Sequence, residues 1–193
     1  CSPQHGFCTR SVALSSATSR ESPMLKTAVK VTSIGGVALS AIAAAQFAFT
    51  EPWEDTVYKP YRDVGGVWTV CTGHTGPDII ISKTYTPAEC EALFHADMLV
   101  KVDIPLSRCI KNQNLPKEVV IALRDFTFNV GGGAACNSTL VKLLNQDKIR
   151  EACNQFSRWV FVKGVFVKGL ENRRVNGLFG MVSERAMCLA GLK

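Results

Sequence analysis

Residues 54–76, EDTVYKPYRDVGGVWTVCTGHTG, form the stretch from which the fold of this chain is predicted. The stretch holds two carboxylates, Glu54 and Asp63, and the hydroxyl of Thr69. A Gly-Gly pair at 65–66 and a Gly-His-Thr-Gly corner at 73–76 are turn signals, and the β-branched run between them is typical of a short strand. We therefore expect a small sheet of two or three strands that carries acidic and hydroxyl side chains close to its turns.

The length and charge of the chain limit what it can be. It has 193 residues, enough for one domain of about 150 residues and an extension. Lys plus Arg (22) exceed Asp plus Glu (16), and the formal charge of +6 favours a polyanionic partner such as nucleic acid, anionic lipid or an acidic wall polymer. No nucleic-acid-binding signature and no aromatic-basic ladder accompany this charge, so we expect no nucleic-acid partner.

The chain has eight cysteines. They include no Cys-x-x-Cys pair and no neighbouring histidine cluster with metal spacing, so we expect no metal and no cofactor. Buried free thiols and disulfides remain as alternatives, and export to an oxidising compartment would favour disulfides. Two of the cysteines, Cys1 and Cys8, lie in an atypical N-terminal segment, and the other six can pair in many ways. Our first choice is Cys109–Cys136, whose members flank a predicted helix, and Cys153–Cys188 and Cys71–Cys90 complete the set.

Residues 1–50 divide into two segments. Residues 1–23 are Ser-rich without periodicity, and the first methionine is Met24. We interpret 1–23 as non-native or translated upstream sequence and exclude it from the fold. Residues 31–50, VTSIGGVALSAIAAAQFAFT, contain no charge and follow Lys26 and Lys30. A helix of this length just spans a bilayer, and the positive flank predicts an N-terminus in the cytoplasm.

The composition of 31–50 makes this hydrophobic helix a marginal anchor, because glycine, serine, alanine and Gln46 outnumber its bulky residues. Three membrane alternatives are a signal peptide cleaved near Ala43–Ala45, a permanent anchor, and an anchor that leaves the bilayer intact. A buried core helix is disfavoured, because such a helix normally has a polar face.

After Ile81 the sequence pattern is mostly helical. Thr86 and Glu89 form a capping box around Pro87, and the helix that follows is expected to break at Ile104-Pro105. Further helices are expected over 116–131, 137–144, 147–156 and 171–189. Residues 159–170 are expected to form a loop or irregular extended stretch packed on the core. The chain is thus predicted to be α+β, with a mostly helical domain and a small antiparallel sheet.

The acidic residues of the opening stretch suggest a chemistry. Glycoside cleavage needs a carboxylic acid that gives a proton, and a second carboxylate that attacks the sugar or activates water. With Glu54 at the end of a helix and Asp63 on the first strand, the two would face each other across a cleft. Thr69, opposite Asp63 on the return strand, would hold a water against it. On residue types alone this is weak evidence, since acidic pairs most often lie on solvated surface.

The spacing of Glu54, Asp63 and Thr69 resembles the phage-type lysozymes, glycoside hydrolase family 24, whose pattern is Glu, eight residues, Asp, five residues, Thr. The resemblance continues through 128–131 with 138–140, through Arg158-Trp159 and through 169–174, and it covers nearly all of 51–193. It implies a lysozyme-like domain over 51–193 with the sheet at the cleft. The implied reaction is hydrolysis of the β-1,4 bond between N-acetylmuramic acid and N-acetylglucosamine in peptidoglycan.

The resemblance also implies roles for single residues. Glu54 would be the general acid, and Asp63 with Thr69 would position and activate water in an inverting reaction. A retaining reaction with Asp63 as nucleophile is the alternative. Supporting or substrate-binding roles are assigned to Arg62, Lys59, Trp68 and His74, although a structural role is favoured for His74.

Two departures from the family pattern are visible. Asp55 stands where the family usually has glycine. About seven residues, NGLFGMV at 176–182, interrupt the family's spacing, either as two further helical turns or as a loop.

One branch of this family, the signal-anchor-release endolysins of lambdoid-type tailed phages, carries a weakly hydrophobic segment like 31–50. It implies that residues 24–50 are a releasable transmembrane helix, which first tethers an inactive enzyme to the host inner membrane and then frees it into the periplasm. A holin or pinholin would act indirectly, by depolarisation. Because 31–50 has no cysteine, we expect the cleft to be reshaped on release without thiol exchange. The enzyme is expected to be a monomer; an inactive wall-binding relative is the alternative, which the intact Glu54, Asp63 and Thr69 disfavour.

Overall fold

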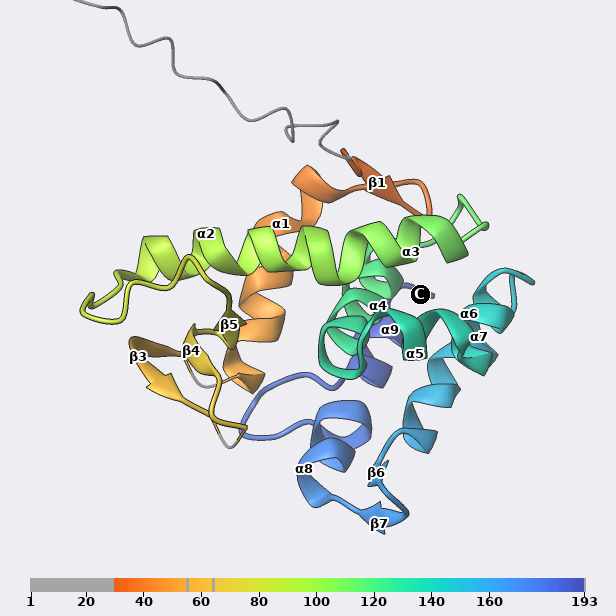
Figure 1. Cartoon of the computed structure of the whole chain (residues 1–193). Helices are drawn as coiled ribbons and strands as arrows, with labels where there is room; N and C mark the ends of the chain where they lie inside the picture. Colours follow the sequence, from red (N-terminus) through yellow and green to blue (C-terminus); the bar gives the residue numbers. More distant parts are fainter. Residues whose placement is uncertain (1–29, 55, 64, 193) are drawn as a thin grey trace, which may run out of the picture.

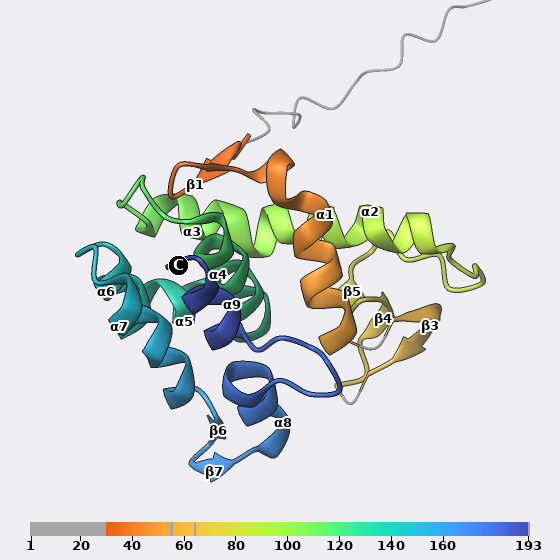
Figure 2. The same ribbon diagram turned by 180° about the vertical axis from the view of Figure 1, so that it is seen from behind.

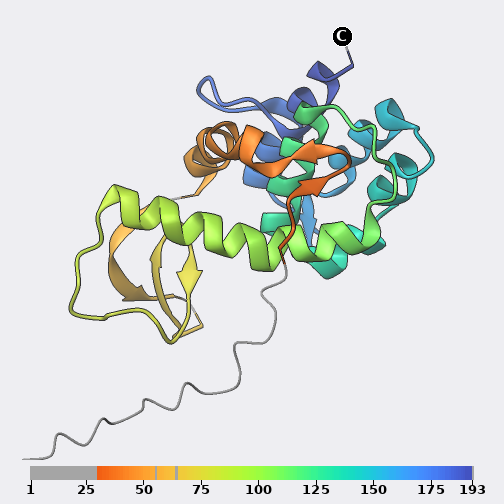
Figure 3. The same ribbon diagram turned by 90° about the horizontal axis from the view of Figure 1, so that it is seen from above.

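A helical rod over residues 87–109 runs across the computed structural model, which describes residues 30–54, 56–63 and 65–192. The rod consists of α2 (Pro87–Asp97), the π-helical η2 (Met98–Asp103) and α3 (Ile104–Cys109). Figure 3 shows the small sheet against the α2 end of the rod and the remaining helices along its opposite side. The interpretation of residues 1–23 concerns a part of the chain outside the described residues.

The expected break at Ile104-Pro105 is wrong. Ile104 N–H still donates to Leu99, five residues earlier, and Pro105 lies in the first turn of α3, where a missing N–H is tolerated. The start of the rod agrees with the sequence. Thr86 Oγ1 accepts from Glu89 N–H at 3.3 Å, and Glu89 Oε2 accepts from Thr86 N–H at 2.9 Å. The rod thus begins where its local capping signal places it.

Helix α4 (Lys117–Val130) lies at the centre of the helical part (Figure 1). Every residue from Val119 to Thr127 is buried, and the helix ends at Gly131, which has a φ of 86°. The shorter helices around it are α5 (Gly132–Asn137), α6 (Thr139–Leu144), α7 (Ile149–Asn154), η3 (Gln155–Arg158), α8 (Lys168–Glu171), η4 (Asn172–Asn176) and α9 (Glu184–Ala190). Ser138 caps α6 by accepting from Val141 N–H, so that predicted helix start is confirmed.

The sheet predicted for the opening stretch is confirmed. It is antiparallel and consists of β3 (Val57–Arg62), β4 (Trp68–Cys71) and β5 (His74–Thr75), in the order β3-β4-β5. Two further hairpins, β1 (Ser33–Ile34) with β2 (Val37–Ala38) and β6 (Phe161–Val162) with β7 (Val165–Phe166), were not expected. In the second of these the four strand residues are 48–66% exposed, so the expectation that residues 159–170 pack on the core is wrong there.

The last helix expected over 171–189 is interrupted. After η4, residues 177–182 form a loop, and α9 begins behind the cap Ser183, whose Oγ accepts from Ala186 N–H at 3.2 Å. Gly177 has a φ of 76°, and a Cβ at this position would lie 2.4 Å from the carbonyl oxygen of Met181. A glycine is therefore required where the helix stops. Of residues 176–182, Asn176 ends η4 and 177–182 form a loop, so the alternative of two further helical turns is wrong.

The hydrophobic helix expected over 31–50 is replaced by a hairpin and a shorter helix, α1 (Leu39–Thr50). Gly35 and Gly36 turn the chain with φ values of 57° and 81°, and a Cβ on Gly36 would lie 1.9 Å from the carbonyl oxygen of Gln113. Figure 2 shows α1 packed across the rod. In the structure α1 packs on the core, and the expectation that a core helix needs a polar face is wrong here, because the exposed face of α1 consists mainly of alanines.

Gln46 supplies this polar contact in the interior. Its Nε2 donates to Thr50 Oγ1 at 3.0 Å, and its Oε1 accepts from Arg124 Nη1 at 3.1 Å. Arg124 in turn makes a bidentate ion pair with buried Asp103 at 2.8 and 3.0 Å. Ile42 and Phe49 of α1 join the same core. Among the described residues, no helix has both the length and the apolar character needed to cross a bilayer.

Disulfides join elements that are distant in the sequence. Cys71–Cys90 connects β4 to α2, Cys109–Cys136 connects α3 to α5, and Cys153–Cys188 connects α7 to α9. They are the same pairs that we chose from the sequence. Each closes a loop, and such crosslinks typically stabilise a fold by about 2–4 kcal/mol through the unfolded state.

The capping box at α2 generates a pH prediction. The hydrogen bond from Lys83 Nζ, at 2.6 Å, followed by those from Thr86, lowers the pKa of Glu89 to about 2 from an ordinary value of 4.5. The stabilisation by the Glu89 charge is therefore present above about pH 4.5 and is lost as the pH falls towards 2. We expect Glu89→Gln to lower the Tm at pH 7 and the difference from wild type to shrink through this window.

The measurement is thermal unfolding followed by circular dichroism from pH 7 to pH 2. Glu91→Gln, on the same helix but outside the capping box, is the control. A Tm difference for Glu89→Gln that stays constant over the whole pH range would contradict the prediction.

Candidate active site

Glu54 lies at the end of a short turn that continues α1. The 3-10 helix η1 (Glu51–Trp53) ends at Glu54, whose N–H donates to the carbonyl of Glu51 at 3.0 Å. This agrees with the expectation that Glu54 ends a helix. The Glu54 side chain is 27% exposed, and its Oε1 accepts from Arg173 Nη1 at 2.6 Å. Within residues 30–54, 56–63 and 65–192, no hydrogen bond reaches its second oxygen, Oε2.

Arg173 of η4 is the residue that sequence reasoning missed. Its Nε and Nη2 form a bidentate ion pair with Asp125 of α4 at 3.1 and 2.9 Å, and Nη1 is left for Glu54. Burial acts to lower the pKa of Arg173, but the charges of Asp125 and Glu54 outweigh it and raise this pKa. The sequence contains a signal for the contact between Arg173 and Asp125. Asp125 lies among apolar residues of the helix expected over 116–131, a buried aspartate requires a cation, and two arginines end the stretch 169–174.

The neighbouring Arg174 turns into the core. It contacts Glu184 at the start of α9 and the side-chain oxygen of Asn129 at the end of α4. Glu184 is completely buried, and this burial raises its pKa well above the ordinary value. Arg173 and Arg174 therefore fasten η4 to α4 and α9, and they fix the position from which Arg173 reaches Glu54.

Asp63 organises the hairpin that joins β3 and β4. Its Oδ1 accepts from Gly65 N–H at 2.8 Å and from Val67 N–H at 2.9 Å. The other oxygen, Oδ2, accepts no hydrogen bond from the part of the chain that the structure describes. The carboxylate is thus held at one oxygen, as Glu54 is, with the second oxygen left for a water or a substrate.

Thr69 is not paired with Asp63 in the sheet, contrary to expectation. Its partner on β3 is Tyr61, because the turn shifts the register by two residues relative to a Thr69–Asp63 pair. The Thr69 hydroxyl is buried and donates to the carbonyl of Val67 at 3.2 Å. Among the described atoms, no hydrogen bond joins Asp63 to Thr69.

The residues given supporting roles lie around this hairpin. Arg62 stacks over Trp68 at 4.8 Å and donates from Nη1 to the carbonyl of Gly66 at 2.6 Å, so both brace the hairpin. Lys59 is exposed on β3. His74 is buried, with Nε2 3.2 Å from Asp78 and Nδ1 3.2 Å from Asp97. The second distance does not have hydrogen-bond geometry. These contacts agree with the structural role favoured for His74.

A cavity of about 360 Å³ opens beside Glu54. Its lining includes the hydrogen-bonded pair Glu54 and Arg173, Asn129 from α4, and the apolar side chains of Trp53, Leu170 and Leu178. Asp63 and Thr69 are not part of this lining. The arrangement places one carboxylate at a partly apolar hollow, and such hollows suit the apolar faces and polar edges of a sugar ring.

The sequence and the fold match known proteins. A model of the phage lysozyme family matches residues 51–176. The chain belongs to the phage lysozyme family. As a phage lysozyme it is a glycosidase, and the expected mostly helical lysozyme-like fold is confirmed.

Several relatives of this phage lysozyme are similar over most of its length. A SAR-endolysin of Enterobacteria phage PA-2 is 42% identical over 174 residues, 88% of this chain and 98% of the relative. A SAR-endolysin of Escherichia phage Mu is 46% identical over 121 residues, 63% of this chain and 69% of the relative. The crystal structure of the active form of the phage P1 endolysin Lyz has the same fold, with a TM-score of 0.63, 21% identity and coverage of 77% of this chain and 85% of that one.

The ion pair at the site generates a stability prediction. Arg173→Met leaves Asp125 fully buried without its cation, and an uncompensated buried charge costs about 3–5 kcal/mol. We therefore expect the free energy of unfolding, measured by urea titration at pH 7, to fall by about this amount. Arg158→Met, at an exposed arginine, is the control and is expected to change it by less than about 0.5 kcal/mol. Equal stabilities of the two variants would contradict the prediction.

Proposed function

We propose that this phage lysozyme is an endolysin that hydrolyses the β-1,4 bond between N-acetylmuramic acid and N-acetylglucosamine in peptidoglycan. The observation that carries the proposal is Glu54, held at Oε1 by Arg173 and open at Oε2 beside the cavity. Membership of the phage lysozyme family and the identity to phage SAR-endolysins support it. The reaction breaks the host cell wall and causes lysis.

In the proposed mechanism Glu54 is the general acid. It gives the proton on Oε2 to the glycosidic oxygen while the bond from that oxygen to the sugar carbon breaks. Asp63 accepts a proton from a water through its open Oδ2, and this water attacks the same carbon from the opposite face. Thr69, on the β4 strand of the hairpin whose turn carries Asp63, is proposed to help to position the water. The outcome is inversion at the anomeric carbon, with retention through Asp63 as nucleophile as the alternative.

Arg173 has a positioning role in this mechanism. Its Nε and Nη2 hold Asp125 in the bidentate contact, and Nη1 donates to Glu54. That hydrogen bond fixes one carboxylate oxygen and thereby directs the other toward the cavity. Arg62, Lys59 and Trp68 lie on the hairpin side, where they are proposed to support or contact the glycan.

The acid role generates an activity prediction. Glu54→Gln preserves the hydrogen-bond acceptor for Arg173 but removes the transferable proton, so we expect clearing of outer-membrane-permeabilised Gram-negative cells to fall by about 10²–10⁴-fold. Turbidity at fixed enzyme concentration is the measurement.

Glu51→Gln changes a carboxylate of the same turn, one that accepts from Thr56 at 3.1 Å, and it is expected to keep most of the activity. Equal clearing by wild type and Glu54→Gln would exclude Glu54 as the acid. Failure of the wild type to clear cells would favour an inactive wall-binding relative.

We further propose that residues 24–50 first tether the enzyme to the host inner membrane, with 51–193 as the catalytic domain in the periplasm and the N-terminus in the cytoplasm. The SAR-endolysin relatives and the uncharged stretch 31–50 support this. Release follows depolarisation by a holin or pinholin, and α1 then takes its place in the core, where Gln46 meets Arg124. Release and folding of α1 reshape the cleft without thiol exchange. The enzyme acts as a monomer, and the disulfides suit the oxidising periplasm.

The anchor generates a further prediction at Ala44, which is exposed on α1 in the structure. Ala44→Leu raises the hydrophobicity of 31–50 without entering the core, so a larger share of full-length chain is expected in the membrane fraction, with later lysis. Ala44→Ser, at the same exposed position, is expected to shift the distribution toward the periplasm.

Membrane and periplasmic fractions of lysing cells are compared by immunoblot. Identical distributions for the two variants would contradict the releasable anchor. A shortened chain in the periplasm would point to a cleaved signal peptide.

A further inference from the structure

Residues 177–182 form a loop that begins just after the last residue matched by the family model, Asn176. The loop is internally ordered. Leu178 and Met181 exchange backbone hydrogen bonds of 3.2 and 2.8 Å, and Gly177 N–H donates to the carbonyl of Asn172 at 2.8 Å. Its far end is held by Ser183 Oγ, which donates to the carbonyl of Val175 at 2.9 Å. Both ends of the loop are thus tied to η4, the element that carries Arg173.

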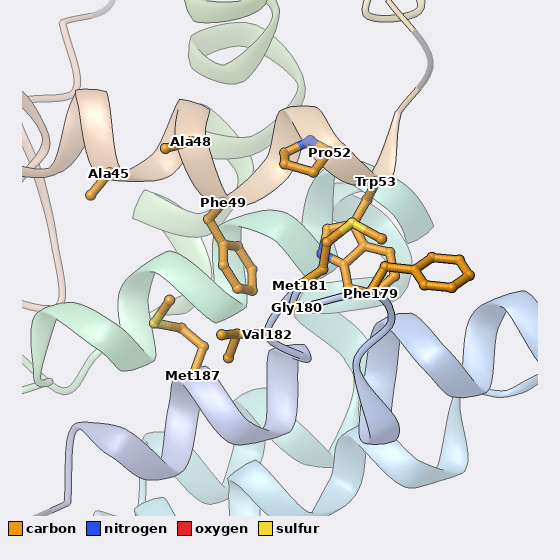
Figure 4. Close-up of a pocket in the computed structure, with 10 residues that line it drawn as sticks. All are labelled: Ala45, Ala48, Phe49, Pro52, Trp53, Phe179, Gly180, Met181, Val182 and Met187. Carbon is orange, nitrogen blue, oxygen red and sulfur yellow. The ribbon is translucent and has the colours of Figure 1, made fainter.

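The side chains of the loop lie on two sides of one residue, Trp53. On one side Leu178 and Trp53 line the cavity that contains Glu54. On the other side Phe179, Met181 and Val182 line an apolar groove of about 540 Å³, again together with Trp53 (Figure 4).

The floor of the groove comes from the released anchor segment. Ala45, Ala48 and Phe49 of α1 line it, and Pro52 of η1 continues it. Figures 1 and 2 both show the loop reaching the C-terminal end of α1. The loop can therefore meet Trp53 in this way only when α1 is seated on the domain.

Trp53 directly precedes Glu54, and their turn has little support of its own. η1 is three residues long and is closed by one backbone hydrogen bond, from Glu54 to Glu51. Arg173 fixes an oxygen of the Glu54 side chain but not the backbone of the turn. A displacement of about 1 Å at a reacting group can reduce the rate by as much as about 10²-fold.

We propose that the loop 177–182 is a positioning element that holds Glu54 through Trp53 once α1 has joined the domain. Arg173 belongs to η4 and the loop follows directly after η4. In the proposal, the same part of the chain therefore holds Glu54 at its carboxylate, through Arg173, and at the preceding residue, through Trp53. The inference rests on the proposed role of Glu54 as general acid. It assigns a function to the extra residues that interrupt the family's spacing.

The test is a double-mutant cycle on the full-length chain, with solubilised peptidoglycan fragments as substrate. Met181→Ala and Trp53→Phe are each expected to lower kcat by about tenfold while the apparent KM changes less than about twofold, since neither removes a charged group from the cavity. The double variant is expected to be little worse than either single one, because both changes act on the same proposed support of Glu54, at two side chains that line one groove.

Val162→Ala provides the matched control for Val182→Ala, because the two valines are similarly exposed, at 51% and 47%, and Val162 lies on the hairpin away from the groove. Val182→Ala is expected to lower kcat and Val162→Ala to leave it unchanged. Thermal unfolding shows whether Met181→Ala folds. If it does not, Val182→Ala still tests the loop, because Val182 is exposed and its truncation removes no core contact.

Wild-type kcat in both loop variants, or strictly additive effects of Met181→Ala and Trp53→Phe, would overturn the inference. A main effect on KM would also overturn it, because the loop would then be contacting substrate. Glu54→Gln separates this result from the proposed function: an active Glu54→Gln enzyme removes the basis of both, whereas an inactive one with wild-type loop variants removes the inference alone.

Discussion

The ion pair between Arg173 and Asp125 is the contact on which the site depends. Asp125 has no exposed surface, so its charge requires a partner of matching geometry, and the guanidinium fork provides two parallel hydrogen bonds. Nη1 of the same group donates to Glu54, 119 residues earlier in the chain. The packing of η4 on α4 therefore fixes one oxygen of the Glu54 carboxylate, in addition to whatever holds the short turn that carries this residue.

The residue before Asp125 makes the second such contact. Arg124 pairs with Asp103 of the rod and with Gln46 of α1. Successive residues of a helix point about 100° apart, so one turn of α4 faces two neighbours at once. Arg124 of α4 binds Gln46 of α1, and Asp125 of α4 binds Arg173, which in turn binds Glu54. The place of α1 and the geometry of the site thus depend on the same buried turn.

Local signals in the sequence predicted local structure well. Three predicted helix ends are present: the capping box at Thr86, the cap at Ser138 and the end of α4 at Gly131. Each of them depends only on residues within about one helical turn of that end. The errors concern local helix geometry in one case and long-range packing in the others. Pro105 does not end the rod, because a π-helical segment precedes it. The hairpin at 161–166 faces solvent although its residues are aromatic and β-branched. Arg173 was recognised as part of a motif, but its contact with Glu54 depends on how η4 packs, which neither residue type nor spacing reveals.

The composition of 31–50 is compatible with the folded domain and with the proposed membrane tether. In the structure the exposed positions of α1 are mainly alanines, which cost little in water and little in lipid, while Ile42 and Phe49 are buried in the core. Gln46 differs from these alanines because its side chain is polar. Moving an amide without hydrogen-bond partners from water into an apolar medium costs about 2–7 kcal/mol of free energy. In the proposed anchored state it would lie in hydrocarbon away from Arg124, whereas in the folded domain its amide is satisfied. Under the proposed tether, this single polar residue would favour departure from the bilayer, and its contact with Arg124 would fix where the helix docks.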